Sequence, residues 1–281
     1  MNILTIDTEE YFQFFEDSYS CERWKSFEVR IYENIERIFR LLEEGNTKAT
    51  FFVIGWIAKE YPDLVRRISE KYELGSHSFS HQLVFKQGRD EFCEEVSSSI
   101  KLLEDISGKR VRYFRAPGFS ITENEKWAFE VLVENGIEID CSVFPAPRAH
   151  GGFPSFGTCE PSIIKYNGVE IKELPISYTK ILNKPVIFSG GGYFRLFPYS
   201  LIKKWTEDSN YVMSYLHPRD FDSKQPMIED LSMFRKFKSY YGIKGAEAKF
   251  KKWLSDFDFV DIDEADKMID WEKAKIINLF S

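Results

Sequence analysis

The chain is poor in several features that define common protein classes. It has four cysteines in 281 residues, Cys21, Cys93, Cys141 and Cys159, and no C-x-x-C pair, so neither a thiolate zinc site nor a disulfide framework is predicted. No apolar run approaches the roughly 18 residues that a membrane-spanning helix needs, and no basic and apolar leader opens the sequence. We therefore expect a cytoplasmic protein without a transmembrane segment.

An excess of basic charge is also missing. Lys and Arg number 38 against 45 Asp and Glu, a formal net charge of −7. This balance argues against a protein whose main affinity is for phosphate backbones or anionic lipid, and we expect no nucleic-acid partner. Apolar residues are abundant at 43%, which is enough for a large core, so one domain over residues 1–281 is expected.

Short β-rich runs alternate with longer helical ones along the chain. Residues 3–6, 49–54 and 111–114 predict strands, whereas apolar spacings of three and four predict helices over 29–42 and 90–106. This alternation predicts an α/β fold with about seven parallel strands, either a barrel or an open doubly wound sheet. The Pro- and Gly-rich residues 144–166 read as a long loop, the run from Ser189 to Gly192 as a turn, and residues 221–281 as a helical C-terminal part.

Two of the four histidines, His77 and His81, lie four residues apart. On a helical turn both imidazoles would lie on one face and could bind one metal ion. The alternative is a pair of ordinary surface or capping histidines.

An acidic group comes directly after the first predicted strand. On a strand Asp7 and Glu9 point the same way and Glu10 points oppositely, so one of the pair could bind metal while the other takes a proton. A solvated acidic turn is the alternative.

Two further polar groups stand at predicted strand ends. Arg115 begins the segment R-A-P-G-F after one strand, where its guanidinium could hold a carboxylate, or could be a surface group beside a turn. His217 ends a late strand, as a general acid or as a partly buried histidine.

Together these motifs resemble the polysaccharide deacetylases, carbohydrate esterase family four. The segments in their order are T-I-D-T-E at 5–9, H-S-F-S-H at 77–81, R-A-P-G-F at 115–119, D-C-S at 140–142 and L-H at 216–217. The likeness covers residues 1 to about 220. Two further segments are similar to those of a bacterial subgroup of this family that is associated with exopolysaccharide or O-antigen gene clusters. They are D-T-E-E-Y-F at 7–12 and G-G-G-Y-F-R at 190–195.

The resemblance implies a distorted (β/α) barrel and a divalent metal, commonly zinc. By position, the resemblance implies that Asp7 is the catalytic base and that Arg115 holds its carboxylate in place. It implies that His217 is the general acid and that Asp140 adjusts the pKa of His217. The Phe119 amide is implied as a hydrogen-bond donor to the oxyanion. The implied metal ligands are His77, His81 and an acidic residue, which is Glu9, with Glu10 as the alternative because Thr8 interrupts the usual pair of adjacent aspartates.

The implied activity is hydrolysis of an N-acetyl group on an amino sugar of a cell-surface glycan or its precursor. A deformylase or other amide hydrolase on the same scaffold, and a carbohydrate-binding protein without catalysis, are the alternatives. Four residues could line the sugar cleft, although core aromatics and surface charge explain them equally well: Arg148, His150, Tyr193 and Arg195.

Overall fold

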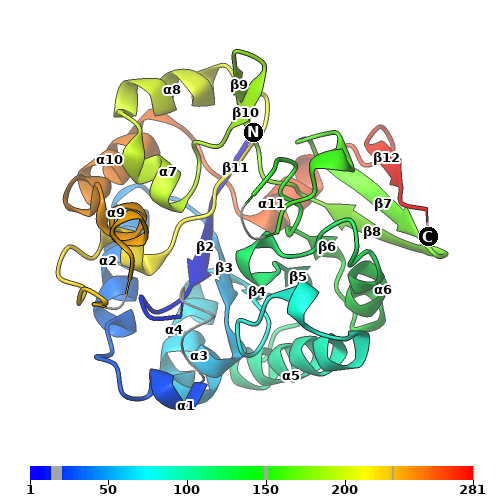
Figure 1. Cartoon of the computed structure of the whole chain (residues 1–281), viewed down its shortest axis with the longest axis horizontal. Coiled ribbons are helices and arrows are strands. Elements are labelled where there is room, and N and C mark those ends of the chain that lie inside the picture. The colour runs from blue at the N-terminus through cyan, green and yellow to red at the C-terminus, as the bar shows by residue number, and fades with distance from the viewer. Residues whose placement is uncertain (14–20, 149–150, 230, 281) are drawn as a thin grey trace. The chain divides into compact units, whose positions relative to one another are not determined.

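The computed structural model describes residues 1–13, 21–148, 151–229 and 231–280. The chain forms two compact units, each made of segments that are distant in sequence (Figure 1). The first unit holds residues 1–49 and 178–261, and the second holds residues 50–177 and 262–281. Residue 220 is not a boundary of either unit, and the single domain over 1–281 stays a prediction.

The first unit is built around short parallel strand pairs. β1 pairs with β11 in parallel, and isolated parallel bridges join Ile3 to Val260 and Ile6 to Leu216. The unit contains, in chain order, β1 (Asn2–Ile3), β2 (Thr5–Thr8), α1 (Cys21–Trp24), α2 (Ile31–Glu44), β9 (Thr179–Ile181), β10 (Lys184–Val186), α7 (Gly191–Leu196), α8 (Tyr199–Glu207), β11 (Val212–Met213), the 3-10 turn η4 (Pro218–Phe221), α9 (Met233–Tyr240) and α10 (Ile243–Asp256).

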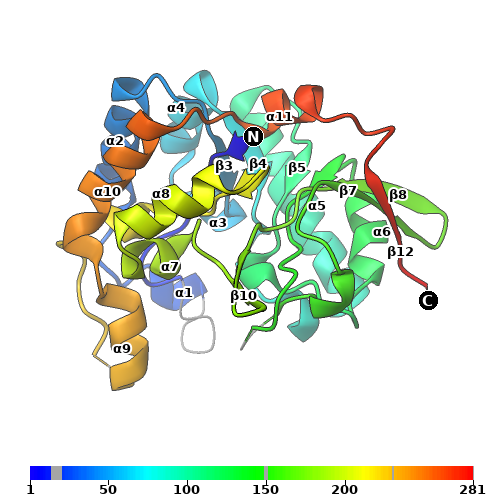
Figure 2. The ribbon, with the colours of Figure 1, turned by 90° about the horizontal axis from the view of Figure 1, so that it is seen from above.

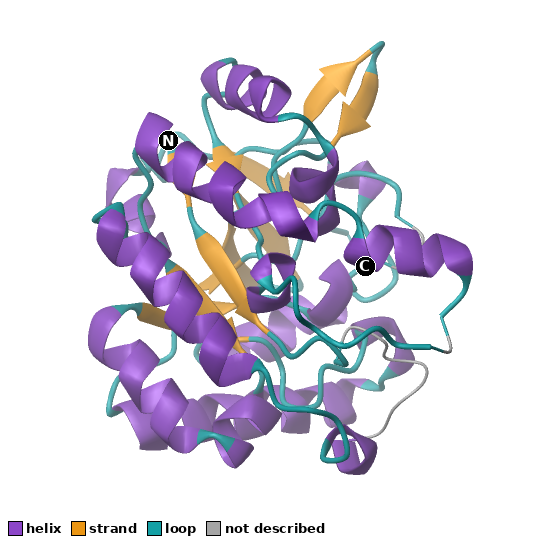
Figure 3. Ribbon diagram, turned by 90° about the vertical axis from the view of Figure 1, so that its left-hand side faces the viewer, coloured by secondary structure: helices purple, strands orange, loops and turns teal. Residues whose placement is uncertain are grey.

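Helix α2 shows how the apolar spacing positions an element. Ile31, Ile35, Ile38 and Leu42 recur at three and four and are all completely buried. The helix begins two residues later and ends two residues later than predicted. The antiparallel hairpin of β9 and β10, which the sequence did not predict, projects as a separate ribbon (Figure 3).

The second unit holds most of the sheet. Its strands lie in the order β12-β7-β8-β6-β5-β4-β3. In chain order the unit contains β3 (Thr50–Val53), α3 (Gly55–Glu60), α4 (Pro62–Lys71), β4 (Glu73–Ser76), η1 (Val84–Lys86), α5 (Arg89–Ser107), β5 (Tyr113–Phe114), η2 (Pro117–Phe119), α6 (Trp127–Glu134), β6 (Ile139–Asp140), η3 (Pro154–Phe156), β7 (Ser162–Tyr166), β8 (Val169–Glu173), α11 (Ile262–Met268) and β12 (Lys275–Asn278).

One strand departs from the parallel arrangement predicted from the sequence. β7 pairs antiparallel with β8, across a two-residue turn in which Asn167 and Gly168 both have positive φ. Asn-Gly is the sequence typical of such a hairpin, because both central residues need φ above zero. The prediction of a loop up to residue 166 is therefore wrong for residues 162–166.

The helices of the second unit lie beside its sheet, and α5 is the longest of those described (Figures 1 and 3). Helix α5 ends at Gly108, whose positive φ closes the helix. Within the described part of the chain, no helix has the length and apolar composition needed to cross a bilayer.

Two glycine substitutions should have opposite effects on stability. A Cβ at Gly75 in β4 would lie 2.5 Å from the Phe52 ring, whereas a Cβ at Gly245 in α10 has no heavy atom within 4 Å. We expect Gly75→Ala to lower the free energy of unfolding by about 1–3 kcal/mol, and Gly245→Ala to raise it by about 0.4–1 kcal/mol. Urea unfolding of both variants measures this, and equal effects would contradict the packing described.

Candidate functional site

Three side chains of the first unit meet where neighbouring strands end. The Asp7 amide donates a hydrogen bond to the Leu216 carbonyl at 2.8 Å. His217 directly follows Leu216, so this hydrogen bond brings Asp7 and His217 side by side. Asp7, Glu9 and His217 each offer an atom that could bind a metal, and these atoms lie within 4.8 Å of one another. The Nε2 of His217 lies 3.9 Å from an Asp7 oxygen and 4.0 Å from a Glu9 oxygen. All three are at least nine-tenths buried.

Glu10 has a different task. One of its carboxylate oxygens accepts the backbone N–H groups of Arg30 at 2.6 Å and Ile31 at 2.7 Å, at the start of α2. A carboxylate is favourable there because the first N–H groups of a helix have no partner within the helix. Burial raises the pKa of Glu10 to about 7, although these backbone hydrogen bonds lower it. Glu9 is thus the acidic residue beside Asp7 and His217, and Glu10 caps a helix.

A second carboxylate holds the other side of the His217 ring. Asp220 accepts from the His217 Nδ1 at 2.9 Å and from the His217 backbone N–H at 2.9 Å. Burial lowers the pKa of His217, but Glu9, Asp220 and Asp7 together raise it above its ordinary value. Burial alone would raise the pKa of Asp220, yet Arg195 and His217 hold it well below its usual range.

This finding corrects the role expected for Asp140. The His217 Nδ1 is bonded to Asp220, so the position that Asp140 was expected to hold behind the ring is taken by Asp220, while Nε2 faces Asp7 and Glu9. Asp220 comes three residues after His217 in η4, a spacing visible in the sequence as H-P-R-D, but it was not among the residues predicted for the site.

Arg195 is also corrected. The guanidinium lies 2.9 Å from Asp220 through Nε, and its Nη atoms donate to the carbonyls of Lys238, Ser239 and Tyr241. The side chain is 4% exposed. Most of its five donors are therefore used inside the protein, so Arg195 orients Asp220 instead of holding the substrate.

The glycine run before Arg195 packs against the same histidine. A Cβ at Gly190 would clash with the Tyr215 ring, and one at Gly191, where φ is +43°, would lie 3.3 Å from His217 Cε1. Helix α7 begins at Gly191, so the predicted turn is wrong in its second half. A side chain at Gly190 would therefore displace Tyr215, and one at Gly191 would press on His217.

In the second unit, His77 and His81 come directly after β4. They lie in a loop with positive φ at Ser78 and His81, so the expected helical turn is wrong. Their rings are still adjacent, with centroids 5.1 Å apart. The carboxylate of Glu95 on α5 fixes the loop, because it accepts from the Ser78 hydroxyl and from the backbone N–H groups of residues 79 and 80. Sequence reasoning missed Glu95, since no spacing connects it with the loop.

The donor chemistry of this pair fits a metal ion. The His77 Nδ1 lies 2.7 Å from the Arg115 carbonyl oxygen. A carbonyl only accepts, so Nδ1 carries the proton and Nε2 keeps the lone pair that a cation needs. His77 and His81 are 1% and 2% exposed, as is typical of residues that serve a site and not the surface.

The sheet of the second unit also holds a buried pair of carboxyl groups. Asp140 and Glu173 are direct register partners on β6 and β8, and both are completely buried. Burial raises the pKa of both carboxyl groups, and the adjacent Asp140 raises that of Glu173 further, well above its usual range. The Ser142 hydroxyl donates to Asp140. Arg115, also fully buried, donates to the Cys141 carbonyl at 3.2 Å.

The amide of Phe119 is used within its own turn. It donates to the Ala116 carbonyl at 3.1 Å in η2, while the Phe119 carbonyl accepts from Gly152. This occupancy corrects the expectation that the Phe119 N–H serves as an oxyanion donor.

The predicted sugar-binding residues have different surroundings. The Arg148 guanidinium lies over the rings of Phe119 and Phe144 and donates to the Gly118 carbonyl. Tyr193 on α7 is 43% exposed. His150 lies outside the described residues. For Arg148, His150 and Tyr193, contact with substrate stays a prediction.

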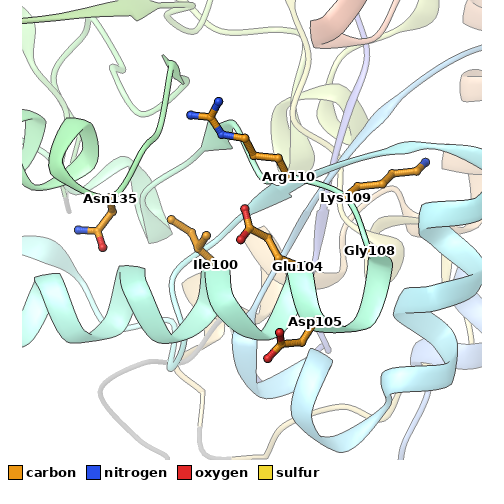
Figure 4. Close-up of a pocket in the computed structure, with 7 residues that line it drawn as sticks. All are labelled: Ile100, Glu104, Asp105, Gly108, Lys109, Arg110 and Asn135. Atoms are coloured by element: carbon orange, nitrogen blue, oxygen red, sulfur yellow. The ribbon is translucent and has the colours of Figure 1, made fainter.

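A pocket at the end of α5 contains none of the predicted site residues (Figure 4). Glu104 accepts the Val111 amide after α5, and Lys109 donates to the Ser69 carbonyl on α4, so two polar groups of the pocket already have partners within the protein. It is lined by Ile100, Glu104, Asp105, Gly108, Lys109, Arg110 and Asn135.

Two family models match successive parts of the chain. Residues 12–137 match a model described as polysaccharide deacetylase, and residues 141–267 match one described as a domain of unknown function, DUF3473. The structure is similar to that of a Mycobacterium smegmatis protein assigned to the polysaccharide deacetylases, with a TM-score of 0.63 and 16% identity over 98% of this chain and 91% of that one. This likeness confirms the α/β class and the distorted (β/α) barrel.

Curated relatives match over shorter stretches. The chain is 34% identical over 96 residues to a peptidoglycan-N-acetylglucosamine deacetylase of Bacillus cereus, which is 34% of this chain and 35% of that protein. It is 39% identical over 82 residues to a chitooligosaccharide deacetylase of Azorhizobium caulinodans, 28% of this chain and 39% of that one. The chain thus spans between about a third and two fifths of these relatives, and the resemblance to the polysaccharide deacetylases is confirmed.

Removing the charge of Asp220 should lower the pKa of His217. The Asp220 carboxylate favours the imidazolium form, so in Asp220→Asn the ring loses its proton at lower pH, and a smaller fraction is protonated at neutral pH. Nitrogen-15 NMR titration of the chelator-treated chain measures this shift, with His217→Gln used to assign the signal. Asp222→Asn is the control, because Asp222 pairs with Arg30. An unchanged or raised pKa in Asp220→Asn would contradict the pairing.

Proposed function

We propose that this chain is a metal-dependent hydrolase that removes the N-acetyl group from an amino sugar, because residues 12–137 match the polysaccharide deacetylase model. The observation that supports this most strongly is the His217 ring, which lies between Asp220 on one side and Asp7 and Glu9 on the other. A buried imidazole among carboxylates is suited to delivering a proton to a leaving group.

We propose that His77, His81 and Glu9 hold the metal, zinc being our expectation. The tautomer of His77 supports this, because its Nε2 is left unprotonated. Glu9 is preferred over Glu10, whose carboxylate binds the start of α2. A divalent cation bound there would polarise an acetyl carbonyl and lower the pKa of water toward about 7.

Asp7 is the proposed base. It takes a proton from the attacking water, whose oxygen forms the new bond to the acetyl carbon. His217 then gives the proton on Nε2 to the sugar nitrogen as the carbon–nitrogen bond breaks, so that a free amine and acetate leave. Asp220 keeps the ring oriented with Nε2 toward the reaction, and Arg195 orients Asp220. The bracing of Asp7 by Arg115 is part of the proposal.

The substrate class is suggested by the two curated relatives, which act on peptidoglycan N-acetylglucosamine and on chitooligosaccharides by their names. We propose that the substrate is an N-acetylated sugar of a cell-surface glycan, of its lipid-linked precursor or of a related nucleotide sugar. Arg148, His150 and Tyr193 are the proposed contacts with the sugar.

Two substitutions should separate chemistry from metal binding. We expect Asp7→Asn and His217→Ala each to reduce acetate release from acetylated chitooligosaccharides by about 10²- to 10⁴-fold, the usual contribution of a general acid or base, while bound zinc stays stoichiometric. Asp208→Asn, at an exposed position, is the control. Release of formate from formylated sugars but no acetate would support a deformylase, and wild-type protein that binds sugar without releasing either acid would support a binding protein.

A matched pair of variants tests the acidic ligand. Glu9→Gln should lower zinc affinity by about 10-fold or more, because it removes an anionic ligand. Glu10→Gln should leave zinc affinity unchanged and instead lower the free energy of unfolding by about 1 kcal/mol, as lost helix caps do. Zinc titration and urea unfolding of both variants measure this, and loss of zinc only in Glu10→Gln would reverse the assignment.

A further inference from the structure

Helix α9 leaves its large apolar side chains in solvent. Met233 is 83% exposed, Phe234 66% and Phe237 51%, and Tyr241 just after the helix is 48% exposed. Positions 233, 237 and 241 are four apart, so they lie on one helical face. Singly exposed apolar residues are ordinary, but a group of four within nine positions is typical of an interaction surface. We name Met233, Phe234, Phe237 and Tyr241 the α9 patch.

Basic residues alternate with the residues of the α9 patch. Residues 231–245 contain Arg235, Lys236, Lys238 and Lys244 and no acidic residue, although the whole chain has a net charge of −7. The Lys238 ammonium lies 4.4 Å from the centre of the Phe234 ring, so positive charge directly adjoins the apolar surface. Among the described residues, none of these four cations forms an ion pair with a carboxylate.

The exposed face belongs to a helix that is firmly held. The Ser232 hydroxyl accepts the Arg235 amide and caps the start of α9. At the other end, the buried Arg195 binds the carbonyls of Lys238, Ser239 and Tyr241. The helix lies at the edge of its unit, in orange at the lower left of Figure 2. Its exposure is therefore a fixed feature of the fold.

We propose that the α9 patch docks on the surface of an anionic lipid membrane. Phe and Met side chains insert into the apolar boundary of a bilayer, while Lys and Arg beside them pair with anionic headgroups. A symmetric dimer through this face would bring two sets of four basic side chains together, which is unfavourable. The overall acidic charge argues against general attraction to lipid, so the contact is restricted to this local basic surface. This inference does not depend on the proposed deacetylase activity.

Flotation of the full chain with vesicles tests the proposal. We expect the protein to float with vesicles of equal phosphatidylglycerol and phosphatidylcholine, and not with phosphatidylcholine alone. In 1 M NaCl, where the Debye length is about 3 Å, binding should be strongly reduced.

Variants of the patch sharpen this test. Phe234→Ser with Phe237→Ser should lower the vesicle partition coefficient by about tenfold or more, and Lys236→Gln with Lys238→Gln should lower it by roughly thirtyfold. The control is Met268→Ser, since Met268 is 63% exposed on α11 beside acidic Asp266 and Asp270. This control should bind like the unaltered chain, and circular dichroism confirms that each variant is folded.

Other results would overturn the proposal. One such result is that the unaltered chain does not float with anionic vesicles. Another is that the variant with Phe234→Ser and Phe237→Ser binds vesicles as strongly as the unaltered chain. A third is a dimer, seen in light scattering, that this variant dissociates. Acetate release from a soluble oligosaccharide should be the same in the patch variants and the unaltered chain. Loss of membrane binding and loss of the proposed activity are thus measured separately.

Discussion

The contact between His217 and Asp220 is the interaction on which the first unit's site depends. It joins a buried imidazole to a buried carboxylate that Arg195 holds from the other side. Around it lie Asp7, Glu9 and Asp220 as anions and Arg195 and Arg219 as cations, all buried. Buried charges are tolerated only when they are compensated. The negative charges of Glu9, Asp220 and Asp7 favour the protonated imidazole, and this is the physical reason why the pKa of His217 is raised although the ring is buried.

One short turn supplies several of these charged groups. The turn H-P-R-D places His217, Arg219 and Asp220 within four residues, directly after the segment that hydrogen-bonds with β2. The same backbone pairing brings Asp7 beside His217. A shift of one residue in this register would turn Asp7 to the opposite face of its strand, because side chains alternate. The site is therefore sensitive to backbone register as well as to side-chain identity.

Features that depend on short-range patterns could be predicted from the sequence. Apolar spacing placed α2 and α5 to within about two residues. The ends of predicted strands pointed to Asp7 and His217 as candidates, and the four-residue spacing pointed to His77 and His81. These patterns could not identify Glu95 or Glu173, because each lies in an element whose own periodicity says nothing about the loop or strand it contacts. The role given to Asp140 was carried over from the resemblance, and Asp220, three residues after His217, was overlooked.

The proposed roles of His77 and His217 differ because their Nδ1 atoms meet different oxygens. The His77 Nδ1 faces the Arg115 carbonyl, a neutral acceptor that fixes the tautomer without adding negative charge. The His217 Nδ1 faces the Asp220 carboxylate, whose charge favours a second proton on the ring. An imidazole must keep a lone pair to bind a metal ion, whereas it must hold a proton to act as an acid. The same side chain is thus suited to two tasks, and the acceptor behind the ring decides which one.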